Sequence, residues 1–470
     1  MHSGSGNSKS SRSYLSIIYL VLFAFLTLNI ASNLGKWERN QIFHYDVCGY
    51  HNYLPALFIY HDLAHFRYID SIETKYTIAD QKRYALYDIP KTGKVCNQYP
   101  IGVAIFQAPF FLIAHALCQR DGKFPADGYS APYQHTTFIS TWFYVILGLF
   151  FLRKFLVAYF NDMIVLLALI ICTIGTNLYI YTVQEPGLSH PYLFFLYACI
   201  LYLTNRLYRK PSWMHAILLG ICLGLCAITR PLDVLIFLIP LFWTTPGTSA
   251  LSKLSFLLEH KYKLLALLLF ALLTVLPQLV YWKEMTGEWL YYSYSEKDYF
   301  QFKQFNIIKG LFSYRKGWFL YSPLLILGFI GALLMSRSKD FKFYFWPFWL
   351  FFVPMIFLVF SWHMWTYGWS FSCRALMETI PLLAFPIAFV LSKLSSLKLK
   401  YIVPAGIIII FLLALSAFQI WQYEQNILQG DAMSKKSYWA IFGKTSINGS
   451  ELDSLIKEQR VIDQKEGNGL

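Results

Sequence analysis

Long apolar runs separated by short polar segments dominate the chain. The first run covers residues 14–33, and later runs cover 100–118, 135–152, 161–182, 188–205, 214–229, 231–244, 264–282, 318–335, 343–361, 374–392 and 401–420. A membrane-spanning helix needs about 17–25 such residues. The 231–244 run is short, and Thr229-Arg230-Pro231 before it predicts a break between two helices, because proline disrupts a helix interior. The pattern predicts an all-α polytopic membrane protein.

Composition supports this class. Hydrophobic residues make up 56% of the 470 residues and charged residues only 14%, against about 25% charged residues in soluble domains. The net charge of +14 would suggest nucleic acid in a soluble protein. Here the basic residues stand in short loops between apolar runs, as in loops that face anionic lipid, so we expect no nucleic-acid partner. The first apolar run is long and lacks an Ala-x-Ala site, which favours a retained helix over a signal peptide.

The distribution of basic residues predicts which runs cross the membrane. If 100–118 does not cross, sixteen basic residues and three acids lie on the side of the N-terminus. The basic residues are Lys9, Arg12, Arg153, Lys154, Arg206, Arg209, Lys210, Lys253, Lys261, Lys263, Arg337, Lys339, Lys342, Lys393, Lys398 and Lys400. If 100–118 did cross, all the later loops would lie outside. Basic residues in short loops favour the cytoplasmic side, so the first arrangement is preferred.

This arrangement has about eleven transmembrane helices. Residues 1–13 form a cytoplasmic tail, 14–420 a membrane domain, and 421–470 an extracytoplasmic tail. Residues 35–134 form a large first extracytoplasmic loop that contains juxtamembrane helices. Within it, 100–118 is predicted to be an interfacial helix, or one that dips into the membrane without crossing it.

The outer loop begins with the stretch 43–53, which contains one carboxylate, two histidines and three tyrosines. Asp46 follows the first apolar run closely and is flanked by aromatic residues. Burial there would raise its pKa toward that of a useful base, and a nearby cation would keep it ionised. The alternative is an ordinary solvated loop acid. We select Asp46 as the catalytic base, with Tyr50 and His51 as neighbouring substrate contacts.

Two further outer segments hold polar groups beside apolar runs, where such groups are costly. Glu185 and His190 flank a short turn, and they are equally well explained as substrate or metal contacts and as a helix-end pair. Arg230 and Asp233 stand at the predicted break. We expect Asp233 to neutralise Arg230 and keep Arg230 as a phosphate contact.

Cations begin two of the later apolar runs. Arg374 follows the aromatic stretch 361–373, and Arg315 and Lys316 precede the 318–335 run. An aromatic girdle at the headgroup level explains much of both stretches. It does not explain the cations, and arginine is suited to binding phosphate. We therefore select Arg374, Arg315 and Lys316 as phosphate contacts.

Taken in order, these stretches resemble the GT-C superfamily of membrane glycosyltransferases, above all the bacterial branch related to protein O-mannosyltransferases and the aminoarabinose transferase of lipid A. The matching features, spread over about residues 44–385, are Asp46, Gln98-Tyr99-Pro100-Ile101-Gly102, Thr229-Arg230-Pro231, Phe312-Ser313-Tyr314-Arg315-Lys316-Gly317, Tyr321-Ser322-Pro323, and Trp365-Thr366-Tyr367-Gly368-Trp369-Ser370-Phe371 with Arg374. Two features depart from the pattern. Val47 follows Asp46 where a second acid would support metal dependence, and Glu185 stands where relatives often have aspartate.

The resemblance implies a GT-C fold, a polyprenyl-phosphate sugar donor and inversion at the anomeric carbon, with Asp46 as base. The acceptor would be a lipid, a glycan or a protein. The site would face the periplasm or exterior of a bacterial inner (plasma) membrane. No cofactor is certain, and a divalent cation stays open. The alternatives are a flippase or transporter of a lipid-linked glycan, an O-antigen-ligase-like transferase with a diphosphate donor, and a non-catalytic assembly subunit. A transporter would place charges along a path through the membrane, whereas here they gather on one side.

Overall fold

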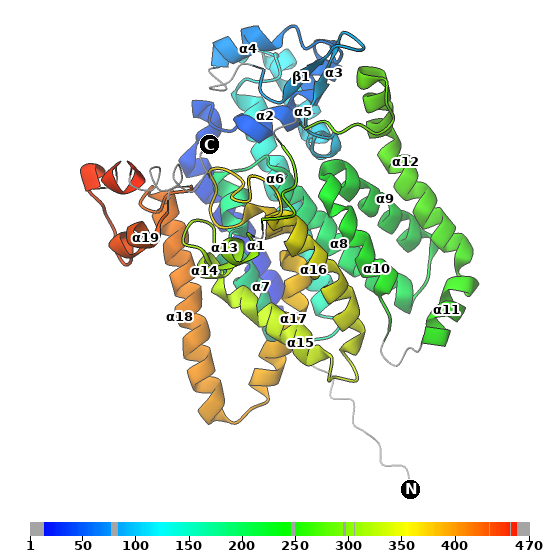
Figure 1. The fold of residues 1–470 in the computed structure, drawn as a ribbon, viewed down its shortest axis with the longest axis vertical. Coiled ribbons are helices and arrows are strands. Elements are labelled where there is room, and N and C mark those ends of the chain that lie inside the picture. The colour runs from blue at the N-terminus through cyan, green and yellow to red at the C-terminus, as the bar shows by residue number, and fades with distance from the viewer. Residues whose placement is uncertain are drawn as a thin grey trace.

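Helices dominate the protein (Figure 1). The computed structural model describes residues 14–76, 83–245, 250–294, 298–304, 306–431, 433–451 and 453–457. The predicted cytoplasmic tail, residues 1–13, and the end of the predicted C-terminal tail lie outside the described residues.

The helices differ widely in length. The longer ones are α1 (Leu15–Leu34), α5 (Gly102–Asp121), α6 (Ala131–Leu156), α7 (Asp162–Ile174), α8 (Ser189–Arg209), α9 (Trp213–Thr229), α12 (Lys261–Thr286), α16 (Phe345–Phe360), α17 (Ile380–Ser395) and α18 (Leu399–Glu424). The shorter ones are α2 (Tyr45–His51), α3 (Tyr53–Phe58), α4 (Ile69–Tyr76), α10 (Leu238–Phe242), α11 (Ala250–Glu259), α13 (Ile307–Phe312), α14 (Trp318–Tyr321), α15 (Ile326–Met335) and α19 (Lys435–Ile441). Short 3₁₀ segments are η1 (Lys36–Arg39), η3 (Pro231–Phe237), η4 (Pro323–Leu325), η5 (Lys342–Tyr344) and η6 (Arg374–Thr379), and η2 (Ile180–Gln184) is a π-helical segment. Strands β1 (Leu86–Ile89) and β2 (Lys94–Asn97) pair antiparallel, with Leu86 opposite Asn97.

Seven described helical segments are long and apolar enough to cross a membrane, judged by length and composition. They are Leu15–Arg39, Gly102–Asp121, Ala131–Leu156, Lys261–Thr286, Lys342–Phe360, Arg374–Ser395 and Leu399–Glu424. The predicted total of eleven spans is not confirmed. Two predicted runs are interrupted: α7 ends at Ile174 within 161–182, and η4 begins at Pro323 within 318–335. Pro323 has no backbone N–H to continue the preceding helix.

Local sequence signals set several helix ends. Gly35 ends α1 with φ of 55°, a conformation that glycine adopts without steric cost, and its N–H donates to the Ala31 carbonyl. The Asn161 side chain begins α7 by accepting a hydrogen bond from the Ile164 N–H. The predicted break at Thr229-Arg230-Pro231 is confirmed, because α9 ends at Thr229 and η3 begins at Pro231.

At one end of the helix bundle, a hydrogen bond and an ion pair join the start of α1 to the turn between α6 and α7. The Asp162 carboxylate accepts a hydrogen bond from the Ser16 N–H at 3.0 Å and pairs with Arg153 at 3.2 Å. The structure therefore places Arg153 at the same end of the bundle as the start of α1. Which side of a membrane this end faces stays a prediction.

The predicted outer loop forms a folded cap at the other end of the bundle, where α2, α3, α4 and the β-hairpin gather (Figure 1). The Asn97 amide donates to the Gly49 carbonyl at 2.7 Å, which joins β2 to α2. The Asn97 backbone N–H donates to the Tyr281 hydroxyl at 2.9 Å, which joins β2 to α12. These contacts join the cap to the helix ends.

Helix α5 links two helix ends that lie on the cap side. A Cβ atom on Gly102 would lie 2.4 Å from the Thr229 hydroxyl, so α5 begins in close contact with the end of α9. Farther along, His115 Nδ1 lies 2.7 Å from the hydroxyl of Tyr133, near the start of α6. By length and composition α5 could cross a membrane. These contacts instead favour the sequence-based hypothesis of an interfacial helix, which stays a prediction.

Labelling of introduced cysteines with a membrane-impermeant reagent tests this topology. Lys123 and Arg209 are both exposed, and the eight native cysteines are buried or half-buried, so background labelling should be low. We expect Lys123→Cys to react from outside intact cells and Arg209→Cys to react only after permeabilisation. A cytoplasmic Lys123→Cys or an externally labelled Arg209→Cys would contradict the topology.

Candidate active site

A cavity of about 550 Å³ lies between the cap and the ends of the helices. Five of the nine predicted site residues line it, namely Asp46, Tyr50, His190, Arg230 and Arg374. Aromatic side chains cover much of the remaining wall: Tyr84, Tyr99, Trp282, Tyr291, Tyr292, Tyr294, Phe300, Trp362 and Tyr367. Segments that are far apart in the sequence thus bring two carboxyl groups (Asp46 and Asp298), two guanidinium groups and two imidazoles (His190 and His363) to one aromatic chamber.

Asp46, in the first turn of α2, has hydrogen-bond partners on both carboxylate oxygens. Arg374 Nη2 lies 2.9 Å from Oδ2, while the hydroxyls of Tyr99 and Tyr84 donate to Oδ1 at 2.7 and 3.0 Å. Burial alone would raise the pKa of Asp46. The Arg374 charge and the two hydroxyls outweigh burial, so the pKa of Asp46 lies below its ordinary value and the carboxylate is ionised.

Close packing in the cap positions these groups. A Cβ atom on Gly49 would lie 2.3 Å from the Tyr99 ring, so only glycine allows that ring to lie against α2 and reach Asp46. Tyr45, directly before Asp46, has φ of 42°, a left-handed conformation that is unfavourable for a bulky residue. Such strain persists where surrounding contacts over-determine the backbone, often at functional sites.

A second buried network surrounds Arg230 at the break between α9 and η3. Arg230 donates to the carboxylate of Glu378 and to the Ala375 carbonyl, and lies 3.6 Å from the Asp233 carboxylate. The other Glu378 oxygen lies 2.9 Å from Nδ1 of His190. Asp233 was expected to neutralise Arg230, and in the structure Glu378 pairs with Arg230 as well.

Glu185 and His51 lie away from the cavity lining. Glu185 accepts a hydrogen bond from the Tyr423 hydroxyl, and burial raises its pKa above the ordinary value. His51 is buried, with Nε2 2.7 Å from the Gly128 carbonyl oxygen and its ring stacked on Phe43. Both residues thus have structural contacts, and Glu185 does not line the cavity that His190 lines.

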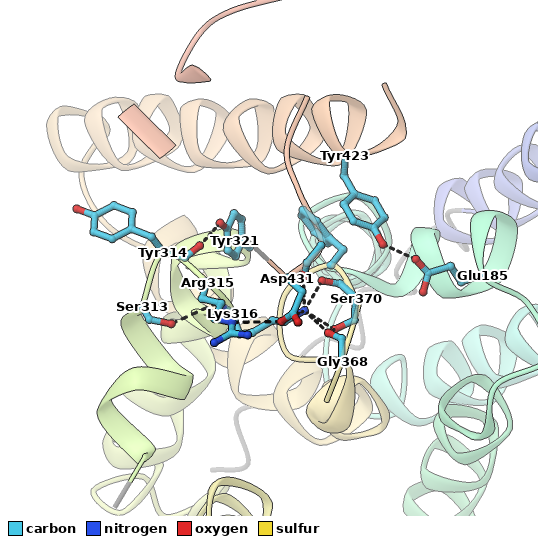
Figure 2. Close-up of polar contacts among 12 residues, drawn as sticks. Glu185, Ser313, Tyr314, Arg315, Lys316, Tyr321, Gly368, Ser370, Tyr423 and Asp431 are labelled. Carbon is cyan, nitrogen blue, oxygen red and sulfur yellow. Dashed lines mark hydrogen bonds and ion pairs between the residues drawn. The ribbon is translucent and has the colours of Figure 1, made fainter. Parts of the chain in front are cut away.

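Arg315 and Lys316 also lie outside the cavity lining. Figure 2 shows both side chains among Gly368, Ser370 and Asp431. The buried Lys316 ammonium donates to the carbonyls of Gly368 and Ser370 at 2.7 and 2.8 Å, and also to the Gly430 carbonyl. Since these acceptors surround the ammonium, Lys316 is placed to fix the loop that leads to Arg374 rather than to bind a phosphate in the cavity.

Replacement of Lys316 by methionine should therefore destabilise the protein. Each buried acceptor left without a donor costs about 1–3 kcal/mol, so the melting temperature in detergent should fall clearly below that of wild type. Lys303→Met is the control, because Lys303 is exposed and its loss should leave the melting temperature unchanged. Equal melting of all three proteins would contradict the role of Lys316.

Sequence reasoning missed Glu378 and Tyr84. Glu378 is a carboxylate inside the apolar run 374–392, and a charged residue within such a run is a functional candidate by default. It also belongs to the same short helical segment, η6, as Arg374. Tyr84 had no comparable signal, because nothing local indicates that its hydroxyl reaches Asp46.

The part of the chain that the structure describes contains no cluster of metal-ligating side chains. Within the described residues, no group of three or more His, Cys, Asp or Glu side chains could hold a metal ion. The acidic and imidazole groups near the cavity instead have arginine, tyrosine or carboxylate partners, as the distances above show.

No protein-family model matches the sequence, and no curated protein matches it. Among solved structures, the Archaeoglobus fulgidus oligosaccharyltransferase in the apo form is similar with a TM-score of 0.48 and 11% identity, over 95% of this chain and 60% of that one. Archaeal oligosaccharyltransferase AglB from the same organism, in complex with an inhibitory peptide and a dolichol-phosphate, gives 0.47 and 10%, over 94% and 60%. This chain thus spans less than two thirds of each of these proteins. Similarity at this level assigns neither a substrate nor a reaction to the chain.

Proposed function

We propose that this protein is an integral-membrane glycosyltransferase that moves a sugar from a polyprenyl-phosphate donor to an acceptor hydroxyl at the outer leaflet. The observation that carries the proposal is the cavity in which Asp46, Arg230 and Arg374 meet. A carboxylate can accept a proton, and guanidinium groups can bind a phosphate. The cavity volume of about 550 Å³ falls within the range of small-ligand pockets, about 300–1,000 Å³.

The reaction is a single displacement. The acceptor hydroxyl loses its proton toward Asp46 while its oxygen attacks the anomeric carbon. The bond from that carbon to the phosphate oxygen breaks, and its electron pair stays on the phosphate. Arg374 and Arg230 stabilise the negative charge that develops there, and attack opposite the leaving group inverts the anomeric centre.

The ion pair between Asp46 and Arg374 has a role in this scheme. Without donor, the two side chains neutralise each other at 2.9 Å. An arriving phosphate competes for the Arg374 guanidinium and frees Oδ2 of Asp46 for the acceptor hydroxyl. The donor thus prepares the base, which limits unproductive binding of the acceptor alone.

The aromatic wall suits a carbohydrate. Sugar rings present C–H faces that pack against aromatic rings, and tyrosine hydroxyls supply hydrogen bonds at the same surface. Trp362 and Phe300 form part of this wall, and their segments are joined by an antiparallel β-bridge between these two residues. The acceptor class and the sugar are left to experiment, and a lipid, glycan or protein acceptor fits the proposal.

Sugar transfer by the purified protein in liposomes tests the proposal. Labelled sugars on polyprenyl phosphate and on polyprenyl diphosphate would be offered with pooled lipid, glycan and peptide acceptors. Transfer from the monophosphate supports the proposal, whereas exclusive use of the diphosphate favours the ligase-like alternative. Movement of the lipid-linked sugar between leaflets without transfer would identify a flippase. Absence of both activities would favour a non-catalytic subunit.

A further inference from the structure

The loop of residues 367–373 leads to Arg374 in a strained backbone conformation. Tyr367 and Ser372 have φ of 55° and 56°, in the left-handed region that is costly for residues other than glycine. Such residues persist where surrounding contacts over-determine the backbone. Because Arg374 directly follows this loop and lines the cavity, the contacts that hold the loop also set the point from which its side chain enters the cavity.

Residues 426–431, which follow the long helix α18, supply several of these contacts. The Gly430 carbonyl accepts a hydrogen bond from the Ser370 N–H at 3.4 Å and another from the Lys316 ammonium. A Cβ atom on Gly430 would lie 2.7 Å from Nε1 of Trp369, so the indole ring lies directly on this glycine. The beginning of the predicted C-terminal tail is therefore packed against the loop that precedes Arg374.

The Asp431 carboxylate fastens this segment to the two cations that follow α13. Its Oδ1 accepts from Nε of Arg315 at 3.2 Å and lies 3.9 Å from the Lys316 ammonium (Figure 2). The side chains of Arg315, Asp431 and Lys316 are only 11%, 11% and 1% exposed. Solvent and salt screen such buried pairs much less than exposed ones. Loss of the Asp431 charge should therefore loosen residues 426–431 and, with them, the loop.

The end of α18 contacts the same loop at a second point. The ring of Tyr423 lies 5.3 Å from that of Phe371, measured between centroids. From the region of η2, the Tyr181 hydroxyl donates to the Phe371 carbonyl at 3.1 Å, and the Asn177 amide donates to the Cys373 carbonyl at 3.3 Å. The strained loop is thus held by two parts of the chain, one near η2 and one that begins at the end of α18.

We infer that residues 426–431 hold the loop that positions Arg374, with Asp431 as the positioning residue. This inference rests on the proposed glycosyl transfer, in which Arg374 stabilises the leaving phosphate. Asp431 lies outside the cavity lining, so it acts through the loop and not on a substrate. The start of the predicted extracytoplasmic tail thereby contributes to the reaction, although it follows the last predicted membrane span.

A double-variant comparison of Asp431 with Arg374 tests the inference. Asp431→Ala should lower the initial rate of transfer, normalised to folded protein, by about 10²-fold, the loss that a misplacement of about 1 Å can cause. In the Arg374→Ala background the same substitution should cause no further loss, because it acts through a side chain that is already absent. A role in general stability would instead lower the rate in both backgrounds.

Asp453→Ala is the control for these rates. Asp453 is an exposed acid of the same tail, so this variant should transfer at the wild-type rate. Wild-type transfer by Asp431→Ala would overturn the inference. An equal loss from Asp431→Ala in the wild-type and Arg374→Ala backgrounds would overturn it as well.

Amide hydrogen exchange provides a readout that needs no sugar transfer. The amides of residues 367–374 should exchange faster in Asp431→Ala than in wild type or Asp453→Ala, whereas those of α6 should be unchanged. If the wild type transfers sugar and exchange in 367–374 is unchanged, the inference is overturned and the proposed function stands. If the wild type transfers no sugar, the proposed function fails, and faster exchange in Asp431→Ala still supports the hold of residues 426–431 on the loop.

Discussion

Asp46→Asn is expected to lower sugar transfer by about 10²–10⁴-fold, the usual contribution of a general base. The substitution removes the proton acceptor but keeps nearly the same shape and can still accept hydrogen bonds from Tyr99 and Tyr84. We therefore expect the variant to fold, insert and bind the polyprenyl-phosphate sugar. The measurement is the initial rate of transfer from a defined lipid donor, normalised to the amount of folded protein.

Two comparisons make this result specific. Asp70→Asn changes an exposed acid of the same outer segment and should transfer at the wild-type rate. Asp46→Glu should be poor, because one extra methylene displaces the oxygen and a misplacement of about 1 Å can cost about 10²-fold. Near wild-type transfer by Asp46→Asn would remove Asp46 from the mechanism.

The pH dependence of the defect follows from the lowered pKa of Asp46. A carboxyl whose folded-state pKa is depressed stays ionised above its ordinary value and loses its charge only as the pH falls below it. Asp46 starts from an ordinary value of 3.8, so it remains ionised from pH 7 down to about pH 5. The ratio of wild-type to Asp46→Asn rates should therefore be constant over that range. A ratio that collapses near pH 6 would show that another group controls the ionisation.

Arg374→Ala is expected to lower transfer by about 10²–10³-fold, as for removal of one donor that stabilises a developing anion. Arg374→Lys should recover only part of this loss, because lysine keeps the charge without the planar fork. Initial rates from the same donor provide the measurement. Arg67→Ala is the control, since Arg67 is an exposed arginine of the same outer loop. Equal rates for wild type and Arg374→Ala would reduce Arg374 to a structural anchor.

The ion pair between Asp46 and Arg374 predicts a second measurable effect of Arg374→Ala, a changed pH dependence of transfer. Arg374 is the largest influence that lowers the pKa of Asp46 against burial. Without it the pKa of Asp46 should rise, so residual transfer by Arg374→Ala should increase with pH more steeply than that of wild type. The double variant Asp46→Asn/Arg374→Ala should lose less than the product of the two single losses, since the residues are in contact. Strictly multiplicative losses would show that the pair is not coupled in the reaction.

The sequence alone predicts that this is an all-α membrane protein. Apolar runs of span length, with few charged residues within them, lead to helices, because a backbone in lipid must satisfy its own hydrogen bonds. The break at Arg230 follows from Pro231, which cannot continue the helix. Asp46, Arg230 and Arg374 could be selected because polar groups beside apolar runs are costly unless they have partners or a function.

Tertiary packing decided which of these groups meet. Asp46 and Arg374 are 328 residues apart in the sequence and 2.9 Å apart in the structure. Lys316 looked equivalent to Arg374 at the start of an apolar run, yet its ammonium is buried among backbone carbonyls. Glu378 lies in an apolar run and holds both His190 and Arg230. Local patterns report how each segment is solvated, whereas the partner of a buried charge depends on which distant segments pack around it.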